Sequence, residues 1–354
     1  MKESNIEKKI LELRSELKTD RLDMSFGEIM NLYDDKDLII SPEYQRAYRW
    51  KDEQKTRFIE SILLGIPIPP IFVAEDEHGK WELVDGLQRI STILSFFGLL
   101  NDNKSKNFFK LTDTELTEGY LKGVDINNLS PKLKLTIKRA VCRVEILRWD
   151  SQFDMRYELF NRLNTGASPL TSQEVRNCVF TGDFNNLLHE LANSNEFKSL
   201  VKPTDKQLEE MFLEELVLRF FAFKYKYNDL LIKYSIQDFL SDFMKDVEKR
   251  KIVINFEEGK QSFYRIVELV KNDLDGKIFR AKNGLFTPNI YDTVMYISDK
   301  CYDENMKDSD RYRKNIERLL EDNEYKKLSG ASTYASKRMK LKIERAEELF
   351  DNAK

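Results

Sequence analysis

The sequence has few of the residues that build disulfide frameworks and metal centres. Its 354 residues include three cysteines and two histidines. Cys142, Cys178 and Cys301 are odd in number and far apart, which excludes a disulfide framework and a zinc-binding spacing. The two histidines, His78 and His189, are too few for a histidine-rich metal site. A reducing compartment suits such a sequence.

The sequence also lacks long apolar runs and an excess of either charge. No run approaches the about 18 apolar residues that a membrane-spanning helix needs, and the charged segment 1–20 has no apolar signal-peptide core. Lys and Arg number 58 and Asp and Glu number 61, which gives a net charge of -3. Any DNA contact must therefore come from local patches. We expect a cytoplasmic protein that does not contact membranes.

Hydrophobic periodicity predicts an α+β fold followed by an all-α region. The predicted strands span residues 38–40, 71–74, 81–84 and 141–147, of which 71–74 and 81–84 form a hairpin. The predicted helices span 4–18, 52–65, 86–97 and 131–139, with further helices from Ser151 and from Thr171. After residue 166 only helical periods remain. We therefore predict a helical extension at 1–24, an α+β domain at 25–166 and an all-helical domain at 167–354.

The first polar cluster, Pro42–Trp50, follows the strand at 38–40. It contains two arginines, two tyrosines and a tryptophan in nine residues. Arginine and aromatic side chains together suit phosphate binding and base stacking. The alternative is a loop that packs its aromatic side chains on the core and leaves its arginines in water.

The second polar cluster, Val84–Arg89, joins a buried strand directly to a helix. The N–H groups at such a helix start are unpaired, and Gly86 permits close approach, so the turn is suited to an anion. Arg89 lies on the first helical turn and could add a bidentate phosphate contact. The alternative is that Asp85 only caps the helix and Arg89 only faces solvent.

The third polar cluster, Phe160–Gly166, contains Asn161, Arg162 and Asn164 at a predicted helix end. An ordinary C-cap with Asn or Gly in the left-handed conformation explains this pattern equally well.

Two basic stretches are candidates for a DNA-binding face. One runs from Lys132 to Arg148 with Glu145 as its single acid, and the other runs from Lys337 to Arg345 with Glu344 as its single acid. The alternative in both cases is a solvated surface. The residues proposed for DNA contact are Lys134, Lys138, Arg139, Lys337, Arg338 and Lys340.

The three polar clusters, taken in order, resemble one family. The pattern is Pro-x-Tyr-Gln-Arg-x-Tyr-x-Trp at 42–50, Ile59–Pro70, Val-Asp-Gly-x-Gln-Arg at 84–89 and Phe-x-x-Leu-Asn-Thr-Gly at 160–166. It resembles the N-terminal domain of GmrSD-type modification-dependent restriction enzymes, a member of the ParB/sulfiredoxin-like superfamily. The resemblance covers roughly residues 25–180.

The resemblance implies a nucleotide-binding α+β domain that acts in defence against foreign or modified DNA. The family is credited with NTP hydrolysis and, in some members, with sensing or cleaving DNA. Its usual signature is Asp-Gly-Gln-Gln-Arg, whereas position 87 here is Leu87, which removes one amide donor. Nucleotide binding is therefore expected more firmly than hydrolysis.

The resemblance also implies roles for individual residues. Arg89 and the amides of 86–89, Leu87 included, would hold phosphate, and Arg46 would neutralise a second phosphate oxygen. Gln45 or Gln88 would orient a water, and Asp85 would hold Mg²⁺ or cap the helix. The remaining expected nucleotide contacts are Tyr44, Trp50, Gly86, Asn161 and Asn164.

Many relatives carry a C-terminal HNH nuclease, which needs at least one histidine as general base. No histidine follows His189. We therefore expect either a separate nuclease subunit or cleavage by the N-terminal domain itself.

Three functions stay open: an NTP-binding and NTP-hydrolysing subunit of an antiviral restriction system, a Mg²⁺-dependent DNA nickase, and a non-enzymatic DNA-binding or regulatory module. The sequence leaves the oligomeric state open, with a homo-oligomer one option.

Overall fold

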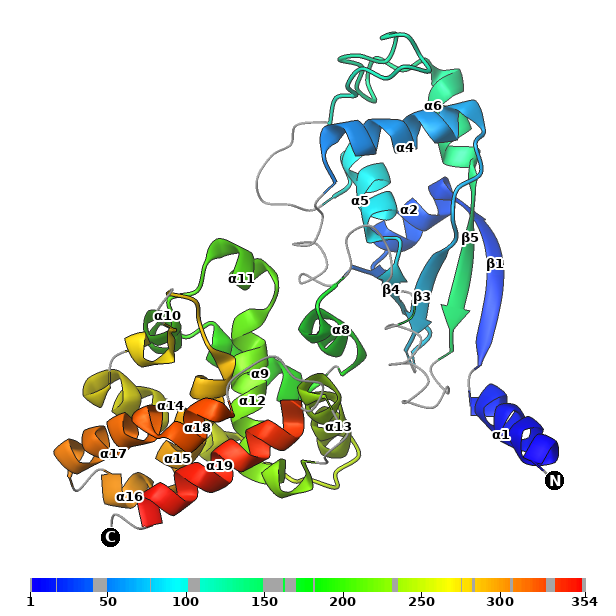
Figure 1. Cartoon of the computed structure of the whole chain (residues 1–354). Coiled ribbons are helices and arrows are strands. Elements are labelled where there is room, and N and C mark those ends of the chain that lie inside the picture. Colours follow the sequence, from blue (N-terminus) through cyan, green and yellow to red (C-terminus); the bar gives the residue numbers. More distant parts are fainter. Residues whose placement is uncertain are drawn as a thin grey trace. The chain divides into compact units, whose positions relative to one another are not determined.

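The computed structural model divides the chain into two compact units, Met1–Leu170 and Thr171–Lys354 (Figure 1). It describes all residues except 1, 17, 41–49, 77, 101–108, 149–161, 163–169, 181, 231–234, 275, 282–283, 306–307, 329–334 and 352–354. The predicted order, an α+β fold followed by an all-helical region, is confirmed. Residue 166, the predicted boundary, lies outside the described residues.

The first unit is built on a five-stranded mixed sheet with the strand order β1-β5-β3-β4-β2. The strands are β1 (Thr19–Ser25), β2 (Leu38–Ile39), β3 (Ile71–Glu75), β4 (Trp81–Asp85) and β5 (Val141–Leu147). β1 with β5 and β3 with β4 are antiparallel, whereas β3 with β5 and β2 with β4 are parallel. The predicted hairpin is the β3–β4 pair, in which Val73 lies opposite Leu83.

The first unit also contains helices. They are α1 (Lys2–Glu16), α2 (Phe26–Asp34), α4 (Asp52–Leu64), α5 (Leu87–Phe96) and α6 (Pro131–Arg139). α2 packs against α6, and α4 packs against both α5 and α6. Their core includes Phe26, Ile59 and Leu94, which are at most 1% exposed. The apolar stripes that predict α4 and α5 are thus the faces that these helices bury.

Sequence periodicity did not predict β1 and α2. Only Met24 of β1 is buried, because β1 is an edge strand whose side chains mostly face water. β1 is held by its full-length register with β5 rather than by an apolar pattern of its own. The helix predicted to begin at Ser151 lies outside the described residues.

The second unit consists of helices. They are α8 (Ser172–Val179), α9 (Asp183–Ala192), α10 (Asn195–Val201), α11 (Asp205–Glu209), α12 (Phe212–Lys226), η1 (Tyr227–Asp229), α13 (Ile236–Glu248), α14 (Phe256–Asp273), η2 (Gly276–Phe279), α15 (Pro288–Lys300), α16 (Tyr302–Asn305), α17 (Ser309–Glu321), α18 (Asn323–Lys327) and α19 (Ala335–Asp351). α12 is central, since it packs against α9, α13 and α15. The predicted capping box is confirmed: Glu174 N–H donates to Thr171 Oγ1, and Thr171 N–H donates to Glu174 Oε2. Among the described residues, no helix is both long enough and apolar enough to cross a membrane.

Candidate functional site

The second polar cluster forms a tight turn between β4 and α5. β4 ends at Asp85, α5 begins at Leu87, and Gly86 between them has a φ of +100°. A Cβ atom at Gly86 would lie 2.4 Å from the Cγ2 atom of Ile71. Both the backbone conformation and the contact with β3 therefore require glycine at this position.

The start of α5 presents backbone donors that the helix itself does not use. The helix has no side-chain cap, and its first internal hydrogen bond runs from Ile90 N–H to the Gly86 carbonyl. The N–H groups that precede this bond have no acceptor within the helix, and the helix dipole is positive at this end. Leu87 is 7% exposed, so its side chain belongs to the core. The turn is thus an electropositive helix start.

Arg89 is held by three hydrogen bonds in this turn. Its Nη1 donates to the carbonyls of Pro69 (2.5 Å) and Pro70 (2.9 Å), and its Nη2 donates to Asp85 Oδ2 (2.7 Å). The Arg89 side chain is 13% exposed, whereas that of Asp85 is 42% exposed. The guanidinium therefore lies beneath the turn, in a fixed orientation, and the carboxylate faces solvent.

Pro69 and Pro70 have a role in this turn that the sequence pattern did not predict. The proline pair did indicate a segment outside the strand ladder, because proline has no N–H group to donate. Their two carbonyls are the acceptors that orient Arg89.

The first and second polar clusters meet at one described point. The backbone N–H of Trp50 donates to Gln88 Oε1 at 3.0 Å. The Trp50 ring packs edge-on against Phe58, with 5.7 Å between centroids. This contact fixes the C-terminal end of the first cluster beside the β4–α5 turn. The other predicted site residues of the first and third clusters, namely Tyr44, Gln45, Arg46, Asn161 and Asn164, lie outside the described residues.

Metal-ligating side chains are sparse around the turn. The described residues contain no group of three or more Asp, Glu, His or Cys side chains that could hold a metal ion. Cys142 of β5 is 1% exposed, and burial raises the pKa of its thiol. The thiol is therefore a protonated core group. Asp85 is the exposed carboxylate of the turn.

The N-terminal basic stretch separates into cations with and without acidic partners. Lys134, Lys138 and Arg139 of α6 form no ion pair with any residue that the structure describes. On β5, Arg143 Nε lies 3.0 Å from Asp23 Oδ1. Directly after β5, Arg148 Nε lies 3.2 Å from a carboxylate oxygen of Glu75. The side chains available to bind an external polyanion are therefore those of α6.

The C-terminal basic stretch does not form a single face. Lys337 is exposed, and Arg338 and Lys340 are half-buried. Lys342 is 1% exposed, with its Nζ 4.7 Å from the centroid of the Tyr325 ring, and burial lowers its pKa to about 8. This part of the expected solvated stretch is a core residue, because α19 buries the face that carries it.

A further arginine–carboxylate cluster lies inside the helical unit. Arg219 Nη1 donates to Asp292 Oδ2 at 2.8 Å, and Arg219 Nε donates to Glu215 Oε1 at 2.9 Å. Arg176 of α8 is fully buried, and its Nη2 lies 3.3 Å from Glu215 Oε2. Burial raises the pKa of Asp292 to about 6, against the opposing charge of Arg219. Nearly enclosed on all sides, this cluster joins α8, α12 and α15.

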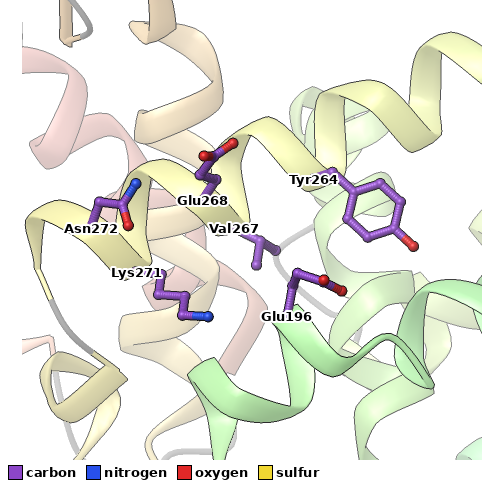
Figure 2. A pocket seen from close by; sticks show the side chains of 6 residues that line it. All are labelled: Glu196, Tyr264, Val267, Glu268, Lys271 and Asn272. Carbon is purple, nitrogen blue, oxygen red and sulfur yellow. The ribbon is translucent and has the colours of Figure 1, made fainter.

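A pocket of about 590 Å³ lies between α10 and α14 of the helical unit (Figure 2). Figure 2 shows Val267 and Lys271 on the side of α14 that faces Glu196 of α10. The lining residues are Glu196, Tyr264, Val267, Glu268, Lys271 and Asn272. Two carboxylates against one ammonium group make this lining unsuited to a phosphate.

The comparisons with known proteins agree with the geometry of the first unit. Residues 26–181 match the family model of the GmrSD restriction endonuclease, N-terminal domain. Comparison with curated proteins finds no match. The family segment contains the β4–α5 turn, Arg89 and the carbonyls that hold it, and the resemblance noted over residues 25–180 is confirmed. Residues 26–181 are therefore similar to the N-terminal domain of the GmrSD restriction endonuclease.

Proposed function

We propose that the domain at residues 26–181 binds a nucleoside triphosphate at the β4–α5 turn and hydrolyses it as part of a DNA restriction system. The observation that carries the proposal is the arrangement of this turn. The β4–α5 turn brings three groups together over residues 85–89. They are the helix-start amides of α5, the exposed carboxylate of Asp85 and the oriented guanidinium of Arg89. Helix starts of this kind bind phosphate groups.

The turn supplies phosphate contacts of two kinds. The backbone N–H groups of Leu87 and Arg89 would bind phosphate oxygens directly. Arg89 would add positive charge from below, since three hydrogen bonds already orient its guanidinium. Because the Leu87 side chain is buried, the Leu-for-Gln departure from the family signature leaves the backbone amide at this position unchanged.

Asp85 is the residue that fits a Mg²⁺ ion. Mg²⁺ is commonly bound by one or two carboxylates together with substrate phosphates, so a single exposed carboxylate suffices. Asp85 meets this requirement, being 42% exposed at the end of β4. When bound, the ion would neutralise phosphate charge. Gln88 would orient the attacking water, as would Gln45.

The first and third clusters would complete the nucleotide site. The Trp50–Gln88 hydrogen bond supports this arrangement for the first cluster. Tyr44 and Trp50 would contact the base, Arg46 would bind a further phosphate oxygen, and Asn161 and Asn164 would close the site.

We assign DNA contact to α6 because its basic side chains have no acidic partners in the part of the chain that the structure describes. Lys134, Lys138 and Arg139 are cations without acidic partners among the described residues, as a phosphate-binding face requires. Lys337, Arg338 and Lys340 stay as a second, weaker candidate.

Thermal unfolding with each of the four NTPs, with and without Mg²⁺, tests nucleotide binding. A ligand present at a hundredfold excess over its Kd stabilises the native state by about 2.7 kcal/mol. We expect at least one NTP to raise the Tm, and Mg²⁺ to increase the rise. The absence of a Tm shift with every NTP at millimolar concentration would contradict the proposal.

A further inference from the structure

The pocket between α10 and α14 is lined by charged side chains that the described part of the chain leaves without partners. The side chains of Glu196, Glu268 and Lys271 form no hydrogen bond or ion pair with any residue that the structure describes. They lie outside the family segment 26–181, so the proposed nucleotide function does not account for them. A concave surface with unpaired charges is suited to a ligand of complementary charge.

Charged residues of α14 on either side of the pocket do have partners. Lys260 pairs with Glu190 of α9. Asp273 Oδ1 lies 3.3 Å from Nη2 of Arg313, which belongs to α17. Helix α14 thus pairs its charges with neighbouring helices before and after the pocket, and leaves them unpaired at the pocket itself.

The two ends of the pocket differ in charge. Five of its lining residues form one stripe of α14, since they recur at intervals of three, one, three and one residues: Tyr264, Val267, Glu268, Lys271 and Asn272. From Tyr264 to Lys271 the helix rises by about 10 Å. Figure 2 shows the Glu196 carboxylate pointing toward the Tyr264 end, whereas the Lys271 ammonium group lies at the other end. One end therefore offers a carboxylate with an aromatic ring, and the other offers hydrogen-bond donors.

Each end suits a different functional group. A guanidinium group pairs with a carboxylate and stacks on an aromatic ring, so it fits between Glu196 and Tyr264. The ammonium group of Lys271 and the amide of Asn272 both donate hydrogen bonds, so they fit a carboxylate. Glu268 lies between the two ends and fits a second cation. A basic α-amino acid carries two cations and one carboxylate, which is the reverse of the two carboxylates and one ammonium group that line the pocket.

We propose that this pocket binds arginine as a free amino acid. The guanidinium group contacts Glu196 and the Tyr264 ring, the α-ammonium group contacts Glu268, and the α-carboxylate contacts Lys271. The pocket volume of about 590 Å³ is within the range of about 300–1,000 Å³ found for small-molecule sites. The helical unit then has a small ligand of its own.

Calorimetric titration of the full chain with L-arginine tests the site. We expect saturable binding at a single site. Citrulline, in which a neutral group replaces the guanidinium, and agmatine, which lacks the carboxylate, should each bind at least about tenfold more weakly. No saturable binding of arginine at millimolar concentration would overturn the proposal, as would equal affinity for arginine and either analogue.

Two variants test the contacts at the ends of the pocket. Glu196→Gln should remove the preference for arginine over citrulline, and Lys271→Gln should remove the preference for arginine over agmatine. The matched control Glu257→Gln changes an exposed carboxylate on α14 outside the pocket and should keep both preferences. Loss of a preference in the control, or its retention in either pocket variant, would overturn the assignment. Unchanged thermal unfolding of each variant confirms that the fold is intact.

Discussion

Each unit contains an arginine–aspartate pair of nearly equal length, but the two pairs have different surroundings. The Arg89–Asp85 distance is 2.7 Å and the Arg219–Asp292 distance is 2.8 Å. Asp85 is 42% exposed and stands beside helix-start amides, whereas the Asp292 side chain is fully buried and shares Arg219 with Glu215. Ion-pair geometry alone therefore does not mark a site. The exposed carboxylate and the adjacent helix-start donors distinguish the pair that we propose binds a ligand.

The largest expected difference between the two pairs is in stability. Asp292→Ala leaves Arg219 buried with less compensation, so it should lower the free energy of unfolding of the helical unit by about 3–5 kcal/mol. Asp85→Ala removes a partly exposed partner and should cost under about 1 kcal/mol. Chemical denaturation of the two variants measures both effects. Equal losses would break the distinction between a buried and an accessible pair.

The buried pair should also make stability depend on pH. The pKa of Asp292 is raised from 3.8 to about 6, so between these values the folded state binds more protons than the unfolded state. Stability therefore falls as pH rises from about 4 to about 6, by about 3 kcal/mol in total. Unfolding of wild type and Asp292→Asn across this range measures the effect. If both showed the same pH dependence, another group would be responsible.

The backbone of the β4–α5 turn should tolerate substitution less well than its carboxylate. Gly86→Ala combines a positive φ with a Cβ atom 2.4 Å from Ile71, and we expect it to destabilise the first unit by about 2–3 kcal/mol. Gly65→Ala is a matched control, since Gly65 has a φ of +73° and a Cβ there would meet no described atom within 4 Å. Urea denaturation of the two variants should separate steric contact from backbone strain. Equal losses of stability would show that steric contact with Ile71 does not contribute to the effect of Gly86→Ala.

The smallest expected effect concerns DNA. Lys138→Ala should weaken DNA binding and reduce the slope of log K against log salt by about 0.9, because one phosphate contact is lost. Arg143→Ala should leave the slope unchanged, since Asp23 already pairs with Arg143. Binding isotherms on duplex DNA at several salt concentrations measure both. A lower slope for Arg143→Ala alone would assign the DNA to β5 instead of α6.

Local patterns in the sequence predicted the elements that bury an apolar face. The β3–β4 hairpin, the strand at 141–147 and the Thr171 capping box follow from residues that contact one another or share a core. β1 was missed, because an edge strand is specified by its partner rather than by its own side chains.

The candidate site was predictable in its residue types but not in its contacts. The carbonyls that orient Arg89 come from Pro69 and Pro70, about twenty residues earlier, and backbone acceptors at that distance leave no periodic signal. For Lys342, in contrast, a local sequence signal for burial was present. Its neighbours Met339, Ile343 and Ala346 on α19 are buried apolar residues. The surrounding basic residues concealed that signal.

Equilibrium titration of Mg²⁺–NTP into wild type, Arg89→Ala and Arg143→Ala tests the central claim most directly. Both variants remove an arginine that pairs with an aspartate in the first unit, but only Arg89 lies at the β4–α5 turn. We predict saturable binding to wild type, an affinity weaker by at least about tenfold for Arg89→Ala, and wild-type affinity for Arg143→Ala. An Arg89→Ala protein that is folded and binds the nucleotide as tightly as wild type would contradict the account.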